Sequence, residues 1–337
     1  MELYPWHKQV WARLAGNPER FPHALLLHGP AGVGKRGFAR CLAQAKLCCA
    51  VDAAGLACGS CISCHWFAQA THPDFRLITS EAESVKTMEA TEEGAESSQQ
   101  RKASNQILID PIRELGMLFQ LSTQRGGMRV IIIQPAEVMN ASAANALLKV
   151  LEEPPADTLL ILVSDQRQRL LPTIQSRCHA VAMPLPEAAV ARQWLRSQGL
   201  VEQAGLALAG GAPLLALACA DAESNTAYRG FVERLCSESD PVALAEHALK
   251  LGPAIVIDWL QKWVYDLASF GLFGVVRYHA DFEAYLSAAS KKADLRSLLR
   301  YQALLLETKR AIHLSLNHQL VLEDAFLGYM ESLEIRP

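Results

Sequence analysis

The first half of the chain alternates short apolar runs with longer amphipathic segments. Apolar runs at 24–28, 75–78, 128–134 and 158–164 predict strands, and the β-branched residues of 128–134 are typical of a strand buried on both faces. The segments between these runs carry apolar residues at helical spacing. Strands that alternate with helices predict an α/β domain whose parallel sheet is covered on both faces.

Two helices of this half have clear boundary signals. Asp110 is a suitable N-cap, and Pro111 is a suitable first helical residue. Segment 140–155 (NASAANALLKVLEEPP) has the apolar spacing of a helix and ends in two prolines, which stop a helix. Both helices are therefore expected to pack an apolar side against the sheet.

The second half of the chain has a different pattern. Strand signals fade after about residue 166, and from about residue 222 the periodicity is helical to the end. Gly210 to Pro213 form a turn between two short helical patterns. We therefore predict three domains: an α/β domain at 1–165, a small helical domain at 166–211 and an all-helical domain at 212–337.

Composition and charge are those of a globular protein. Of the 337 residues, 50% are hydrophobic and 20% are charged, which argues against wholesale disorder. No apolar run is long enough for a membrane span, and the N-terminal residues show no secretory signal, so we expect a cytoplasmic protein without membrane contact. Segment 81–104 carries six glutamates against three basic residues and few large apolar side chains, which predicts a disordered surface loop.

A glycine-rich loop follows the first predicted strand. Gly29, Gly32, Gly34 and Lys35 match the pattern G-x-x-x-x-G-K, in which backbone N–H groups and the lysine bind phosphates. The hydroxyl residue that would bind Mg²⁺ next is replaced by Arg36, whose charge repels a cation. The residues leave open whether the loop binds ATP or is only a structural turn.

The acidic pair that holds the metal in P-loop ATPases is also missing. Gln134, the last residue of the run 128–134, and Pro135 stand where the acidic pair is expected, and Glu137 is the nearest acid. Because both metal-binding positions are lost, the sequence predicts a P-loop scaffold that does not hydrolyse ATP. The alternative is an active ATPase that uses Lys35 and an unconventional acid such as Glu137.

Four closely spaced cysteines predict a metal site. Cys49, Cys58, Cys61 and Cys64 supply four thiolates within 16 residues, a spacing suited to structural Zn²⁺ in a closed tetrahedral site. Cys48 is an alternative to Cys49, and His65 is an alternate or supporting ligand. An iron–sulfur cluster uses the same ligands, and unliganded thiols are the third possibility.

Several motifs together resemble the bacterial clamp-loader branch of AAA+ proteins. They are the P-loop, the four-cysteine insertion after its helix, AANALLKVLEEPP at 143–155 and Ser-Arg-Cys at 176–178, with a C-terminal match at 316–323. The resemblance covers nearly the whole chain. It implies an AAA+ domain with a zinc module at 49–64, a small helical lid at 166–211 and a helical collar at 212–337.

The resemblance also implies a function and partners. Motor subunits of the gamma/tau type keep the P-loop hydroxyl and the acidic pair, which this chain lacks, and Ala212 stands where a sensor arginine is expected. The chain then resembles a non-hydrolysing subunit of the DNA polymerase III clamp loader. Its implied partners are gamma/tau and delta subunits in a ring that loads the sliding clamp onto primed DNA. Arg177 is implied to act in trans as an arginine finger.

Two other classes of function compete with this interpretation. One is an active gamma/tau-like ATPase motor. The other is a zinc-dependent DNA-binding module, which the formal net charge of −3 and the lack of a basic, aromatic-interleaved stretch disfavour.

Overall fold

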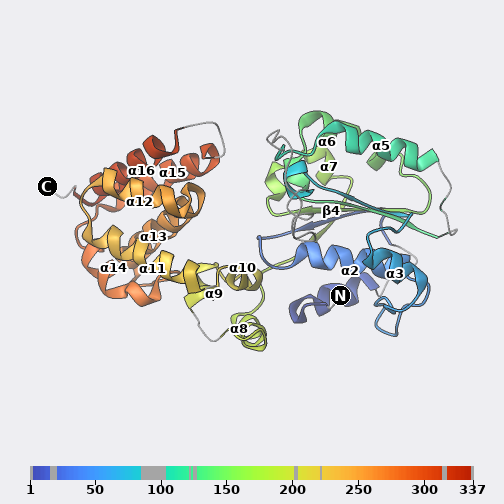
Figure 1. Cartoon of the computed structure of the whole chain (residues 1–337), viewed down its shortest axis with the longest axis horizontal. Helices are drawn as coiled ribbons and strands as arrows, with labels where there is room; N and C mark the ends of the chain where they lie inside the picture. Colours follow the sequence, from blue (N-terminus) through green and yellow to red (C-terminus); the bar gives the residue numbers. More distant parts are fainter. Residues whose placement is uncertain are drawn as a thin grey trace, which may run out of the picture. The chain divides into compact units, whose positions relative to one another are not determined.

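The structure, a computed structural model, consists of two compact units. They are residues 1–190 and 191–337, and each is described separately (Figure 1). The described residues are 3–15, 21–84, 104–120, 123, 127–200, 204–220, 222–312 and 317–334.

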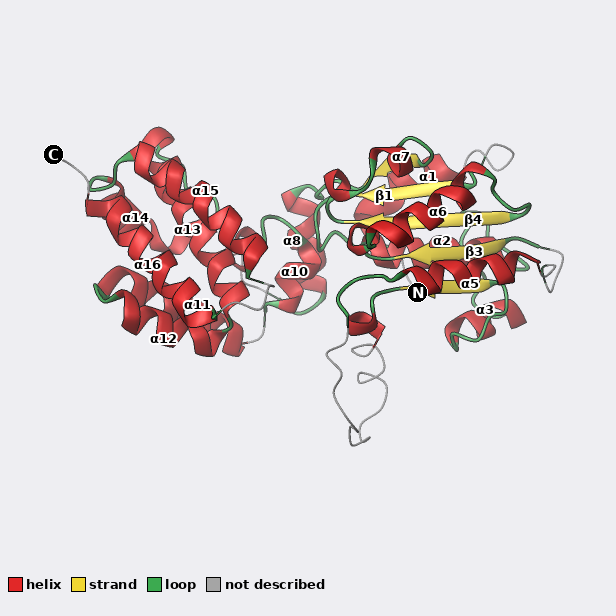
Figure 2. Ribbon diagram, turned by 90° about the horizontal axis from the view of Figure 1, so that it is seen from above, coloured by secondary structure: helices red, strands yellow, loops and turns green. Residues whose placement is uncertain are grey.

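The first unit is built on a five-stranded parallel sheet with the strand order β2-β3-β4-β1-β5 (Figure 2). The strands are β1 Ala24–His28, β2 Phe75–Ile78, β3 Arg129–Ile133, β4 Thr158–Ser164 and β5 His179–Ala182. All residues of β3 and β4 are buried, as expected for central strands covered on both faces.

Helices cover both faces of this sheet because successive strand residues point to opposite sides. Leu25 and Leu27 belong to a core with the first three helices, whereas Leu26 packs with the next three. Figure 1 shows α2 and α3 on one side of β4, and α5, α6 and α7 on the other. The helices are α1 Lys8–Ala15, α2 Lys35–Leu47, α3 Ile62–Ala68, α5 Ile109–Gln120, α6 Ala141–Glu152 and α7 Pro172–Gln175. Short 3₁₀ helices lie at Pro5–His7, Ala136–Val138 and Arg167–Arg169.

The structure confirms the predicted α/β class and four strands, and it corrects two boundaries. The strand β5 was not predicted, because it is a short edge strand with one buried side chain. It pairs with β1, so the sheet domain extends beyond the predicted end at residue 165. The helix α5 begins at Ile109, which places Asp110 inside its first turn and not at the N-cap.

Only the ends of the acidic segment 81–104 are described. Residues 85–103, on which the prediction of disorder mainly rests, lie outside the described residues. The two described ends are joined, because the Ala82 N–H donates to the Ser104 carbonyl at 3.1 Å. The Ser104 N–H donates to the carboxylate of Glu81 at 3.0 Å. The two described ends of the segment therefore lie side by side.

The second unit contains only helices among its described residues, as predicted. A small group is formed by α8 Ala188–Ser197, α9 Ala204–Leu208 and α10 Pro213–Ala218, with Leu195, Leu206 and Ala216 in one core. The turn at Gly210 and Gly211 therefore lies within this group, whereas the prediction ends the small helical domain at residue 211. A larger bundle follows, with α11 Ala222–Ser237, α12 Pro241–Leu251, α13 Pro253–Phe273, α14 Glu283–Ser290, α15 Leu295–Ala311 and α16 His318–Glu334; a 3₁₀ turn lies at Ala280–Phe282.

Asp266 on α13 is a buried carboxylate that fixes the chain after this helix. It accepts hydrogen bonds from the backbone N–H groups of Arg277, Tyr278 and His279 at 2.8 to 3.0 Å, and the His279 ring lies 2.9 Å away. Burial raises the pKa of Asp266, but the His279 ring and these N–H donors outweigh burial and hold the pKa below its usual range.

The variant Asp266→Ala is expected to lower the free energy of unfolding of the second unit by about 3 kcal/mol, because it leaves several buried donors without an acceptor. Urea unfolding measures this loss. The exposed ion pair of Arg229 and Asp281 provides the control, since Asp281→Ala should cost less than about 1 kcal/mol. Equal losses in the two variants would contradict the structural role of Asp266. Because the folded-state pKa is lowered, this stabilisation is present above the unfolded-state pKa of about 4 and disappears as the pH falls through the folded-state pKa.

Candidate functional site

The glycine-rich loop joins the carboxyl end of β1 to the first turn of α2, the position at which a P-loop binds phosphate. Gly32 and Gly34 adopt φ values of +76° and +91°, which favour glycine. A Cβ atom at Gly34 would lie 2.6 Å from the ring of Tyr4. The loop therefore lies between a strand and a helix, and Tyr4 approaches it closely from the N-terminal side.

Lys35 does not extend from this loop into solvent. Its side chain is 3% exposed, and its Nζ donates to the carbonyls of Gly29 at 2.8 Å and Pro30 at 2.6 Å. It also forms an ion pair of 2.5 Å with Asp165, the residue after β4. No local sequence signal points to Asp165, because the contact joins two loops that are 130 residues apart. The cation that would bind phosphate is thus neutralised by a carboxylate of the same chain.

Arg36 is also paired. Its guanidinium lies 2.5 Å from the carboxylate of Glu83, at the start of the acidic segment. An arginine at this position offers only donors, so it cannot replace the hydroxyl that ligates Mg²⁺.

N-terminal side chains cover the loop. Trp6 donates its indole N–H to the Val33 carbonyl at 2.9 Å, and Tyr4 stacks on Trp6 with ring centroids 5.0 Å apart. His7 is 3% exposed and contacts the rings of both residues at their edges. The pKa of His7 is lowered to about 4, mainly by burial, and the charge of Lys35 contributes to the same shift. His7 is therefore neutral at physiological pH, and these rings fill the space beside Gly34.

The residue that replaces the acidic pair of an ATPase, and the nearest remaining acid, both have defined places in the structure. Gln134 is buried at the end of β3, where the acidic pair is missing. Glu137, the alternative acid, lies in the following 3₁₀ helix and accepts the backbone N–H of Asp165 at 2.9 Å. Glu137 therefore fixes the residue that pairs with Lys35.

Arg177 lies in the turn between α7 and β5. Its guanidinium forms an ion pair of 2.7 Å with Glu152 and donates to the Thr173 carbonyl at 3.0 Å. Its side chain is 37% exposed. Glu152 is the last residue of α6 and belongs to the LEEPP motif. Its spacing along the helix does not reveal whether it contacts another residue or only faces solvent. The tertiary structure brings the two motifs together, so that Arg177 is oriented and accessible.

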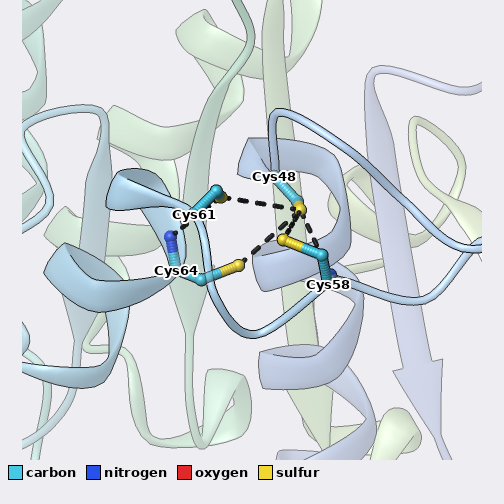
Figure 3. Close-up of side chains that lie close together, drawn as sticks. All are labelled: Cys48, Cys58, Cys61 and Cys64. Carbon is cyan, nitrogen blue, oxygen red and sulfur yellow. Dashed lines mark hydrogen bonds between the residues drawn. The ribbon is translucent and has the colours of Figure 1, made fainter.

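The cysteine cluster extends from the C-cap of α2 to the first turn of α3 (Figure 3). The sulfur atoms of Cys48, Cys58, Cys61 and Cys64 all lie within 4.8 Å of one another. Cys48 Sγ is 3.5 Å from Cys58 Sγ, 3.8 Å from Cys61 Sγ and 3.6 Å from Cys64 Sγ. A tetrahedral zinc site with Zn–S bonds of about 2.3 Å requires S–S separations of about 3.8 Å. These four thiols can therefore hold a metal ion.

The ligand set predicted from the spacing needs one correction, because the structure places Cys48 and not Cys49 in the cluster. The helix α2 ends at Leu47, and Cys48, in an extended conformation, is its C-cap. Its sulfur accepts the backbone N–H groups of Ala50 and Cys58, whereas Cys49 is exposed. The cysteine count in the motif does not reveal this choice, because it depends on where the helix ends.

The surroundings of the thiols differ. Burial is the main cause that raises the pKa of Cys64, to about 12, whereas backbone N–H donors of Ser60 and Cys61 lower the pKa of Cys58. The N–H group of Cys64 also donates to the sulfur of Cys61, which caps α3. Such N–H···S contacts stabilise the thiolate form, which is the form that binds metal.

A parallel sheet with a P-loop, covered by helices and followed by an all-helical unit, defines a protein of AAA+ type. A family model described as "DNA polymerase III, delta subunit" matches residues 7–187, more than half of the chain. The chain belongs to this family, as a clamp-loader subunit of the delta-prime kind.

Several relatives are named DNA polymerase III subunit delta'. The one from Pseudomonas aeruginosa is 34% identical over 310 residues, which cover 89% of this chain and 84% of the relative. Those from Haemophilus influenzae and Escherichia coli K12 are 31% and 30% identical; their alignments cover 69% and 65% of this chain, and 64% and 61% of the relatives. A solved gamma subunit-related protein from Thermotoga maritima aligns with a TM-score of 0.44 and 16% identity, covering 97% of this chain and 100% of that chain.

The family gives the chain its role in the replication of DNA, as a component of the DNA polymerase III clamp loader. No helix among the described residues is both long and apolar enough to cross a membrane.

Proposed function

We propose that this chain is a non-hydrolysing subunit of the clamp loader and supplies Arg177 to the ATP site of a neighbouring subunit. The observation that carries the proposal is a contrast between two cations. Both cations are paired within the chain, but the Lys35 side chain is 3% exposed, whereas the Arg177 side chain is 37% exposed beside Glu152.

The loss of hydrolysis follows from the P-loop. Hydrolysis needs Mg²⁺ between the phosphates and a lysine that is available to them. Here Lys35 is bound by Asp165 and two loop carbonyls, and Arg36 replaces the metal-binding hydroxyl. A bound nucleotide would have to displace Asp165 from Lys35. This pairing supports the interpretation that the loop is a structural element.

The proposed role of Arg177 rests on the exposure of its side chain and on the two groups that hold its guanidinium. A guanidinium supplied in trans stabilises the charge on the transferring phosphoryl group. The carboxylate of Glu152 and the carbonyl of Thr173 hold the Arg177 guanidinium from within the chain, which limits its freedom before a partner binds. We propose gamma/tau subunits as the neighbours that receive it. The delta subunit, the sliding clamp and primed DNA are the further partners of the assembled ring.

The metal of the cysteine cluster is proposed to be structural Zn²⁺. Four protein thiolates complete a tetrahedral site and leave no position for water, which is typical of structural zinc and not of catalytic zinc. Cys48 at the end of α2 would then be linked to Cys58, Cys61 and Cys64 around α3, so that the metal joins two segments of the chain.

The purified chain is expected to hydrolyse ATP no faster than a protein-free blank containing Mg²⁺, and Lys35→Ala is expected to leave that rate unchanged. Both expectations follow from the missing metal ligands and the internal pairing of Lys35. Release of inorganic phosphate measures the rate. Hydrolysis above the blank that Lys35→Ala abolishes would overturn the proposal in favour of an active motor subunit that uses Glu137.

A further inference from the structure

Two buried polar residues lie directly behind the cysteine cluster and are not among its ligands. Ser63 is 1% exposed and His72 is 3% exposed. The Ser63 hydroxyl donates to the Leu47 carbonyl at 2.5 Å, and its oxygen lies 2.8 Å from His72 Nε2. A hydroxyl has a single proton, which is used on Leu47, so the His72 Nε2–H must donate to Ser63.

The other nitrogen of His72 is used as well. His72 Nδ1 accepts the backbone N–H of Asp74 at 3.1 Å, which requires this nitrogen to be unprotonated. The His72 carbonyl accepts the N–H of Phe75, the first residue of β2. Trp66 of α3 contacts the imidazole at its edge, with ring centroids 6.0 Å apart. The imidazole is thus fixed in one tautomer and one orientation against the sheet.

This chain of hydrogen bonds joins the two segments that carry the cysteines. Leu47 ends α2 and directly precedes Cys48, and its carbonyl is one that a helix end leaves without an intrahelical partner. Ser63 lies between Cys61 and Cys64 on α3. The bond between Ser63 and Leu47 therefore sets the distance between Cys48 and the other cysteines, and His72 anchors it to β2.

We propose that Ser63 and His72 are positioning residues for the metal and hold Cys48 in register with Cys61 and Cys64. This inference rests on the proposed metal site. Residues that orient metal ligands typically raise metal affinity by about 10- to 100-fold. Here the support acts through the backbone carbonyl of Leu47, because the Ser63 hydroxyl donates to that carbonyl and not to a sulfur atom.

The test uses the full chain and compares Ser63→Ala, His72→Phe and His72→Gln. Competition with a chromophoric chelator gives the Zn²⁺ affinity, and the charge-transfer absorption of the Co²⁺-substituted protein reports four-thiolate coordination. We expect Ser63→Ala and His72→Phe to bind Zn²⁺ about 10- to 100-fold more weakly. The amide N–H of His72→Gln can replace the Nε2–H donor, so its affinity should lie within about threefold of the wild type, less than the effect of losing the support.

His23→Ala and Ser197→Ala are the matched controls, because each removes a histidine or a serine that is exposed and lies outside the cysteine cluster. Both should bind Zn²⁺ like the wild type. Wild-type affinity in a folded Ser63→Ala variant would overturn the inference, and so would equal affinities in His72→Phe and His72→Gln. If His72→Phe does not fold, Ser63→Ala and His72→Gln still decide it. Failure of the wild-type chain to bind either ion would instead refute the metal site itself.

Discussion

Replacing Arg177 with alanine is expected to abolish most ATP hydrolysis at the neighbouring site in the assembled clamp loader. An arginine finger contributes about 10³- to 10⁵-fold to kcat, so the loss at the site served by Arg177 should be at least about 10³-fold. The measurement is DNA-stimulated hydrolysis by the reconstituted complex, followed in a single turnover, together with loading of the sliding clamp onto primed DNA.

Two further variants distinguish a finger from a general surface charge. Arg177→Lys keeps the charge but loses the planar, multidentate donor, so it should restore only a small part of the activity. Arg113→Ala removes another exposed arginine of the same unit, with a side-chain exposure of 68%, and should leave hydrolysis unchanged. If Arg177→Ala and Arg113→Ala hydrolyse ATP and load the clamp equally well in a complete complex, Arg177 is not a finger.

Cys48→Ser is expected to reduce the Zn²⁺ affinity of the chain by more than about 100-fold, since losing a ligand costs more than losing a residue that supports one. Cys49→Ser should keep one tightly bound ion per chain. The sulfur of Cys48 lies within 3.8 Å of three other sulfurs, whereas Cys49 is exposed outside the cluster. Metal content after dialysis and chelator competition measure the difference.

The pair of adjacent cysteines makes this comparison well controlled. Each variant removes one thiol from the same dipeptide, so the two proteins differ only in which sulfur remains. Cys236→Ser, in the second unit, controls for the loss of any thiol and should bind metal like the wild type. Loss of the ion in Cys49→Ser with retention in Cys48→Ser would restore the ligand set predicted from spacing alone.

Local patterns predicted most of the sheet, because a strand buried on both faces must be continuously apolar. The run at 158–164 became β4 with the predicted bounds, and 128–134 became β3 at Arg129–Ile133. The same criterion missed β5, whose edge position buries only Val181 of its four residues. The domain boundary was consequently placed too early, since β5 belongs to the sheet through its pairing with β1.

The candidate sites also contain residues that local sequence reveals and partners that it does not. The P-loop, the cysteine motif and Ser-Arg-Cys are each a short segment of sequence, and each missing metal ligand is expected at a fixed position after a strand or loop, so residue types and spacing are sufficient to find them. The partners of these residues are not contiguous. Asp165 reaches Lys35 from the end of β4, and Glu152 reaches Arg177 from the end of α6.

The class of fold, the family resemblance and the missing Mg²⁺ ligands can thus be read from residue types and their spacing, because they depend on backbone periodicity and local residue chemistry. The cysteine that joins the cluster, the carboxylate that neutralises Lys35 and the contacts that orient Arg177 emerge only on folding. They depend on where helices end and on which loops the parallel sheet brings close together.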